Sequence, residues 1–114
     1  MGVPQFGGNT KTGLLLNNVS QNNGGISGTT HGIATKLYVE MIQGSVTGIY
    51  RIQLYDSTAG VWYPFVNFYL EADTPYFVNS TFIGPAAPAN DTVQLWNAST
   101  SVGNLTLYGV ADLG

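Results

Sequence analysis

From Ile33 to Leu70, apolar side chains tend to recur at every second position, and this alternation limits the possible folds of the chain more than any other feature of its sequence. Successive side chains of a β-strand point to opposite faces, so this alternation predicts strands with one buried face. Leu37, Val39 and Met41 are expected to share one face, with Tyr38, Glu40 and Ile42 on the other, and the expected core-facing positions of the next strand are Tyr50, Ile52 and Leu54. No segment carries the apolar spacing of a helix without interruption by glycine or β-branched residues, and we therefore expect an all-β protein.

Two of the expected strands, residues 47–55 and 61–70, are separated by the turn sequence 56–60, which predicts a hairpin. The second strand is apolar on both faces and is therefore expected to be buried on both. Pro64 has no backbone N–H to donate, which predicts a sheet edge or a bulge at that point. Strict alternation would place Tyr63, Phe65, Asn67 and Tyr69 on one face, and Trp62, Phe68 and Leu70 on the other.

The rest of the chain adds further strand signals. We expect strands at residues 14–19 and 76–83, and a last hairpin that pairs residues 92–97 with 105–110. Residues 20–32 and 84–91 are rich in Gly, Asn, Thr or Pro and are expected to be loops. Seven or eight strands at roughly 10–14-residue spacing predict an antiparallel β-sandwich of jelly-roll type.

One domain is expected, spanning residues 13–114, preceded by an N-terminal arm at residues 1–12. The arm contains only Val3, Pro4 and Phe6 as apolar anchors, too few to offset the entropy of ordering it alone. We expect it to dock on a neighbouring subunit or a capsid protein, with a frayed terminus as the alternative.

Charged residues make up only 8% of the chain, against about 25% in an ordinary soluble domain. The three basic residues are too few for a nucleic-acid binder, and no run of 18 apolar residues is present to span a membrane. Cysteine is absent, and the residues after Met1 do not resemble a signal peptide. We therefore expect a protein made and assembled in the cytoplasm, whose surface is polar and uncharged or covered by partners.

No motif indicates catalysis or a cofactor. His31 is the one histidine, and no G-x-S-x-G sequence marks a nucleophile, so we expect neither an enzyme nor a bound cofactor. Glu71, Asp73 and Asp91 could supply oxygen ligands to calcium, a question the sequence leaves open, although Asp73 more simply caps the following turn. The N-x-S/T triplets at Asn18, Asn79, Asn90, Asn97 and Asn104 are interpreted as turn chemistry.

The aromatic residues point to an interface. A sandwich has one core, so a strand with two aromatic faces predicts a partner on the second, and Tyr, Trp and Arg are enriched at such contacts. Arg51 is expected to pair with Glu40 or to anchor the interface. The interface candidates are Phe6, Arg51, Trp62, Tyr63, Phe65, Tyr69 and Trp96. Exposed tryptophans could instead act as stacking platforms for sugars.

The segment Val3–Thr12, in which Lys11 is the one charged residue, and the stretches Thr47–Ser57 and Gly60–Tyr63 resemble those of small head decoration (cement) proteins of tailed bacteriophages. The resemblance implies a structural virion protein without catalytic residues. Such a protein forms oligomers, most often trimers, and binds the major capsid protein or another virion protein so as to bridge subunits. The alternative is a lectin-like carbohydrate-binding module of a phage tail or surface protein.

Overall fold

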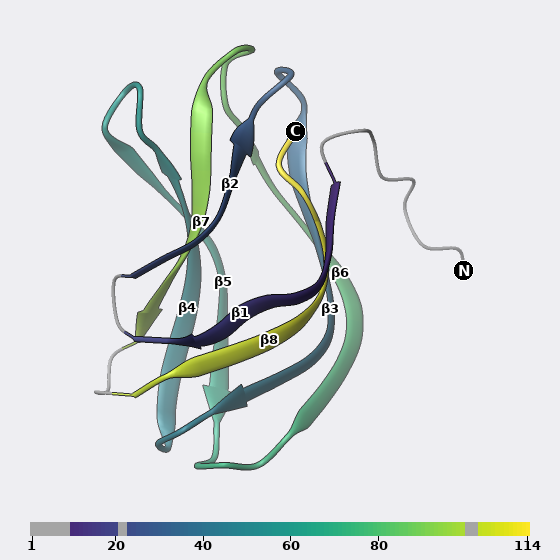
Figure 1. Ribbon diagram of the computed structural model, residues 1–114, viewed down its shortest axis with the longest axis vertical. Coiled ribbons are helices and arrows are strands. Elements are labelled where there is room, and N and C mark those ends of the chain that lie inside the picture. Colours follow the sequence, from purple (N-terminus) through teal and green to yellow (C-terminus); the bar gives the residue numbers. More distant parts are fainter. Residues whose placement is uncertain (1–9, 21–22, 100–102) are drawn as a thin grey trace.

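The computed structural model describes residues 10–20, 23–99 and 103–114, and it arranges them as two sheets without a helix (Figure 1). The strands are β1 (Thr10–Val19), β2 (Asn23–Thr29), β3 (Ala34–Gly44), β4 (Gly48–Asp56), β5 (Val61–Leu70), β6 (Tyr76–Ala86), β7 (Thr92–Ser99) and β8 (Leu105–Asp112). The expected all-β antiparallel sandwich is confirmed. In these ranges, no helix has the length and apolar character needed to cross a membrane.

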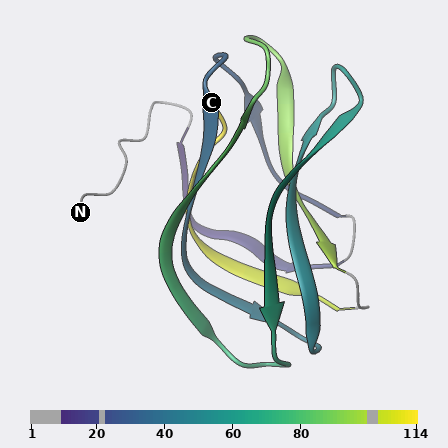
Figure 2. The same cartoon turned by 180° about the vertical axis from the view of Figure 1, so that it is seen from behind.

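Each sheet has four antiparallel strands. Sheet A has the order β1-β8-β3-β6, and sheet B has the order β2-β7-β4-β5. Four strand pairs are arranged symmetrically about the β4–β5 turn: β4·β5, β3·β6, β2·β7 and β1·β8. The chain therefore runs as one long hairpin whose strand pairs are divided between the two sheets. Figure 2 shows the two layers from behind.

The predicted hairpin of residues 92–97 with 105–110 is wrong. β7 lies in sheet B between β2 and β4, whereas β8 lies in sheet A between β1 and β3. In these central positions each strand has hydrogen-bonding partners on both sides and buries its apolar face, which a two-stranded hairpin cannot provide. A short connection in the sequence therefore joins different sheets rather than neighbouring strands.

The predicted loop at residues 20–32 is also wrong over much of its length, because it contains β2. β2 pairs with β7 despite its glycines, and a register shift occurs between Gly24 and Ile26. A Cβ atom at Gly25 would overlap the Leu16 side chain, so the glycine permits β1 and β2 to approach closely. Tertiary packing here overrides the low strand propensity of the local sequence.

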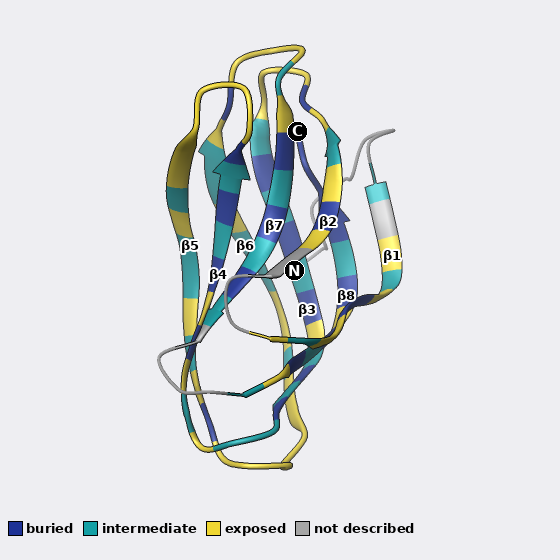
Figure 3. Ribbon diagram, turned by 60° about the vertical axis from the view of Figure 1, so that its left-hand side comes forward, coloured by how far each residue is buried: buried dark blue, intermediate teal, exposed yellow. Residues whose placement is uncertain are grey.

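The core lies between the inner faces of the two sheets, and buried positions alternate with more exposed ones along β3, β4, β7 and β8 (Figure 3). Tyr50, Ile52 and Leu54 are fully buried, which confirms the predicted core face of β4. The Tyr50 hydroxyl donates to Val46 O at 2.6 Å and accepts from Val46 N–H at 3.2 Å, so its burial leaves no unpaired polar group.

Bulges change which side chains face inward in two strands. In β3 a register shift between Val39 and Met41 buries Ile42 completely and leaves Met41 half-buried on the outer side, so the expectation that Met41 shares a face with Leu37 and Val39 is wrong. A bulge inserts one extra residue and thereby reverses the alternation beyond it.

In β5, Val66 pairs with Ile52, and Pro64 pairs with the next residue of β4, Gln53. Phe65 therefore has no partner on β4 and is the extra residue of a bulge. Pro64 thus lies at a bulge and on an edge strand, as predicted. Tyr63, Phe65, Val66 and Phe68 pack against the core, whereas Trp62, Asn67 and Tyr69 are exposed. The expectation that Phe65 and Tyr69 share a face is therefore wrong, and the outer side of β5 is uncovered in the single chain.

Two element boundaries differ from the sequence expectation. Thr10–Thr12, at the end of the predicted arm, form the start of β1 opposite Val110–Asp112. Residues 1–9, including Phe6, lie outside the described residues. β6 continues through Gly84 and Pro85, which were expected to begin a loop.

Replacing Ile52 with Ala should lower the free energy of unfolding by about 2–5 kcal/mol, because the side chain is fully buried between the sheets. Chemical denaturation measures this loss. Ile49 is the matched control: it lies on the same strand, is 45% exposed, and its replacement by Ala should cost no more than about 0.5 kcal/mol. Equal losses in the two variants would show that the faces of β4 are assigned wrongly.

Candidate functional site

The outer face of sheet B carries three aromatic side chains from three neighbouring strands: Tyr55 on β4, Trp62 on β5 and Trp96 on β7. The Tyr55 and Trp62 ring centroids are 4.4 Å apart, and the Trp62 and Trp96 rings meet edge to face at 5.0 Å and 86°. Tyr55 and Trp96 are 5.9 Å apart. Such tilted contacts are the favoured geometry of aromatic pairs. We call Tyr55, Trp62 and Trp96 the aromatic cluster; its Trp62 is 42% exposed.

Polar side chains surround the aromatic cluster on the same face. Gln94 Oε1 accepts a hydrogen bond of 2.8 Å from Trp96 Nε1, which fixes the indole. Farther along the sheet, Arg51 Nε donates to Asn67 Oδ1 at 3.1 Å. The expected partner of Arg51, Glu40, is on β3 in the other sheet, so the structure does not bring the two together. The face thus combines aromatic surface with amide and guanidinium groups.

The outer face of sheet A carries an apolar row that crosses all four strands. Leu14 on β1 lies opposite Tyr108 on β8, Tyr108 lies opposite Met41 on β3, and Met41 lies opposite Phe77 on β6. Leu14 is 49% exposed, Tyr108 44% and Phe77 68%. We call these four residues the apolar row. The sequence reasoning missed it, because the row exists only once non-adjacent strands are placed in register.

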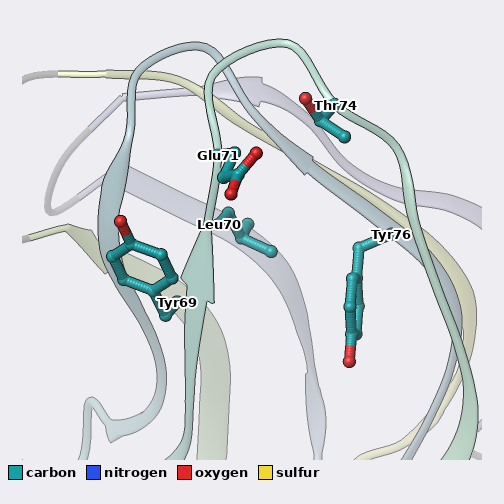
Figure 4. Close-up of a pocket in the computed structure, with 5 residues that line it drawn as sticks. All are labelled: Tyr69, Leu70, Glu71, Thr74 and Tyr76. Carbon is teal, nitrogen blue, oxygen red and sulfur yellow. The ribbon is translucent and has the colours of Figure 1, made fainter.

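A shallow pocket of about 300 Å³ lies where β5 turns into β6 (Figure 4). It is lined by Tyr69, Leu70, Glu71, Thr74 and Tyr76. The two tyrosines lie on either side of Leu70 and Glu71 and are mostly exposed, 66% for Tyr69 and 56% for Tyr76. The pocket offers two phenol rings and one carboxylate to a small ligand.

The carboxylates considered for calcium do not gather at one place. Glu71 and Asp73 lie in the β5–β6 connection, whereas Asp91 lies at the other end of β6, beside Asp56. The pKa of Asp91 is raised, first by a hydrogen bond with the Asp56 carboxyl, then by burial and by repulsion from Asp56. Among the described residues no group of three or more His, Asp or Glu side chains is assembled.

The predicted site residues therefore divide into two groups. Arg51, Trp62, Tyr69 and Trp96 lie on the outer side of sheet B, where a partner could reach them. The other two described candidates, Tyr63 and Phe65, pack against the core instead. His31 is exposed in the β2–β3 connection, where its backbone N–H donates to Gly114 O.

The asparagines of the N-x-S/T triplets fall into two classes. Asn18, Asn79 and Asn90 have φ between 49° and 68°, the left-handed conformation that asparagine tolerates better than most residues. Asn97 is instead fully buried and donates from Nδ2 to Val19 O at 3.2 Å. A local backbone conformation thus accounts for three of these positions, and a long-range hydrogen bond accounts for Asn97.

The comparisons with known proteins give no function to consider for this chain. No protein-family model matches it, and neither a curated protein sequence nor a solved structure matches it. What the protein does must therefore be inferred from the outer faces of its own two sheets.

Proposed function

We propose that the protein is a structural virion protein, a capsid decoration or cement protein that binds copies of itself and a capsid lattice. The apolar row on sheet A carries this proposal. Contiguous exposed apolar surface on a soluble protein marks an interaction site, and each square ångström buried contributes about 25 cal/mol. The low charge of the chain, 8%, fits a surface that is covered in the assembly.

The two outer faces support a bridging role. The apolar row is on sheet A and the aromatic cluster is on sheet B, so they face opposite directions across the sandwich. One face can contact a second copy while the other contacts the capsid protein. Every interface that forms only in the assembled particle stabilises it by mass action, and no chemical step is needed.

The winding of the chain is consistent with such a role. Strand pairs symmetric about the β4–β5 turn and split between two four-stranded sheets are the arrangement expected of a jelly roll. Jelly rolls occur in viral capsid proteins and also in lectins, so this architecture supports both candidate functions. We favour a homotrimer, with the major capsid protein or another virion protein as the second partner.

Carbohydrate binding is the second candidate, and the aromatic cluster favours it. Trp62 presents 42% of its surface to solvent beside Trp96 and Gln94, which combines a stacking platform with hydrogen-bonding groups. The same side chains serve equally well as anchors in a protein interface, where Trp, Tyr and Arg dominate the binding energy.

Changing Phe77 to Asn should convert the oligomer into a monomer, because it places a polar group at the most exposed position of the apolar row. Sedimentation or native mass spectrometry at micromolar concentration measures the change. Ile83→Asn is the matched control, since Ile83 is 67% exposed on the same strand but lies outside the row. A wild-type chain that is already monomeric under these conditions would contradict self-association.

Changing Trp62 to Ala should reduce attachment to assembled particles about 30-fold, the effect of removing an interface anchor of about 2 kcal/mol. Occupancy on purified particles, measured against protein concentration, gives this ratio. Val61→Ala is the control, because Val61 is its neighbour and is 41% exposed. Unchanged occupancy, together with sugar-dependent quenching of tryptophan fluorescence that Trp62→Ala abolishes, would favour the carbohydrate-binding function instead.

A further inference from the structure

Asp56, the last residue of β4, has a buried carboxylate oxygen without a partner. Its Oδ1 accepts hydrogen bonds from the backbone N–H groups of Thr58 at 3.1 Å and Ala59 at 3.2 Å. Its Oδ2 is buried and makes no hydrogen bond, and the residue as a whole is 0% exposed. A buried polar oxygen without a partner is costly, so the free oxygen calls for a proton donor or a cation.

The Asp91 carboxyl faces this group across the end of the sandwich. Asp56 directly precedes Ser57 and Asp91 directly precedes Thr92, so the backbone contact between Ser57 and Thr92 brings the two mutually repelling carboxyls to the same end of the sandwich. Backbone hydrogen bonds hold the facing segments in place: Ser57 N–H donates to Thr92 O at 3.0 Å, and Thr30 N–H donates to Asp91 O at 2.8 Å.

The basic side chains that the structure describes are engaged at other places. Arg51 binds Asn67 on the outer face of sheet B. Lys36 is on β3 in sheet A, in register with Asp112. The pair of carboxylates therefore has no counter-charge from these residues.

We propose that Asp56 and Asp91 bind a hard divalent cation, calcium in preference to magnesium, at the end of the sandwich where the β2–β3, β4–β5 and β6–β7 connections meet. Carboxylate oxygens are the preferred ligands of both ions, and calcium tolerates the irregular geometry that loops provide. Two protein carboxylates leave the remaining positions to water, which places the dissociation constant in the weak class, on the order of 10⁻⁴–10⁻³ M. The ion joins the β4–β5 turn to the β6–β7 connection.

Thermal unfolding of the full chain, first treated with EGTA and then titrated with CaCl₂ or MgCl₂, tests the proposal. Calcium at about 10 mM should raise the wild-type Tm by several degrees, and magnesium should raise it less. Asp91→Asn should abolish the rise, because it removes one of the two charged ligands while keeping the size of the side chain. Asp73→Asn is the matched control: Asp73 is an exposed carboxylate in the β5–β6 connection, and its variant should respond as the wild type does.

Isothermal titration calorimetry with CaCl₂ alone gives a readout independent of stability, with binding expected for the wild type and Asp73→Asn but not for Asp91→Asn. A calcium response that Asp91→Asn retains would overturn the proposal, because the ion would then bind elsewhere. A wild-type chain that is unaffected by calcium, and more stable in EGTA than Asp91→Asn, would also overturn it. The two carboxyls would then be joined by a shared proton.

Discussion

The packing of two apolar sheet faces against each other is the interaction on which the rest of this structure depends. Every strand in the described ranges contributes side chains to that contact, and Tyr50, Ile52 and Leu54 of β4 lie fully within it. Once these faces meet, the opposite side of each strand must point outward. The apolar row and the aromatic cluster are therefore consequences of core packing, because each occupies positions that the core has left to solvent or to a partner.

Departures from regular alternation determine what those outer faces contain. The bulge at Phe65 brings Val66 and Phe68 to the inner side of β5 and turns Asn67 and Tyr69 outward beside Arg51. Without the bulge, the aromatic residues of β5 would be distributed differently between core and surface. A bulge at an edge strand also disturbs the regular row of unpaired backbone groups and so discourages unspecific strand pairing. The bulge thus determines which β5 side chains the outer face of sheet B presents, and it interrupts the free edge of that sheet.

A charge content of 8% makes the few ionised groups unusually informative. Arg51 is held by a neutral partner, Asn67, on a surface that also presents aromatic and amide groups. At the end of the sandwich, Asp56 and Asp91 place two carboxyls together although the chain has few opposite charges to offer. A protein stabilised chiefly by apolar burial can tolerate this locally, provided that a proton or a cation neutralises the pair.

By itself, the sequence determined the fold class, the β4–β5 hairpin and the core face of β4, because each depends on residues close together in the chain. Only the tertiary structure decided that Asn23–Thr29 is a strand, that β7 and β8 belong to different sheets, and that Ile42 rather than Met41 is buried. Strand pairing and bulge positions follow from contacts between distant residues, which a local period of two does not encode. For the same reason the apolar row and the Asp56–Asp91 pair became visible only once the strands were placed in register.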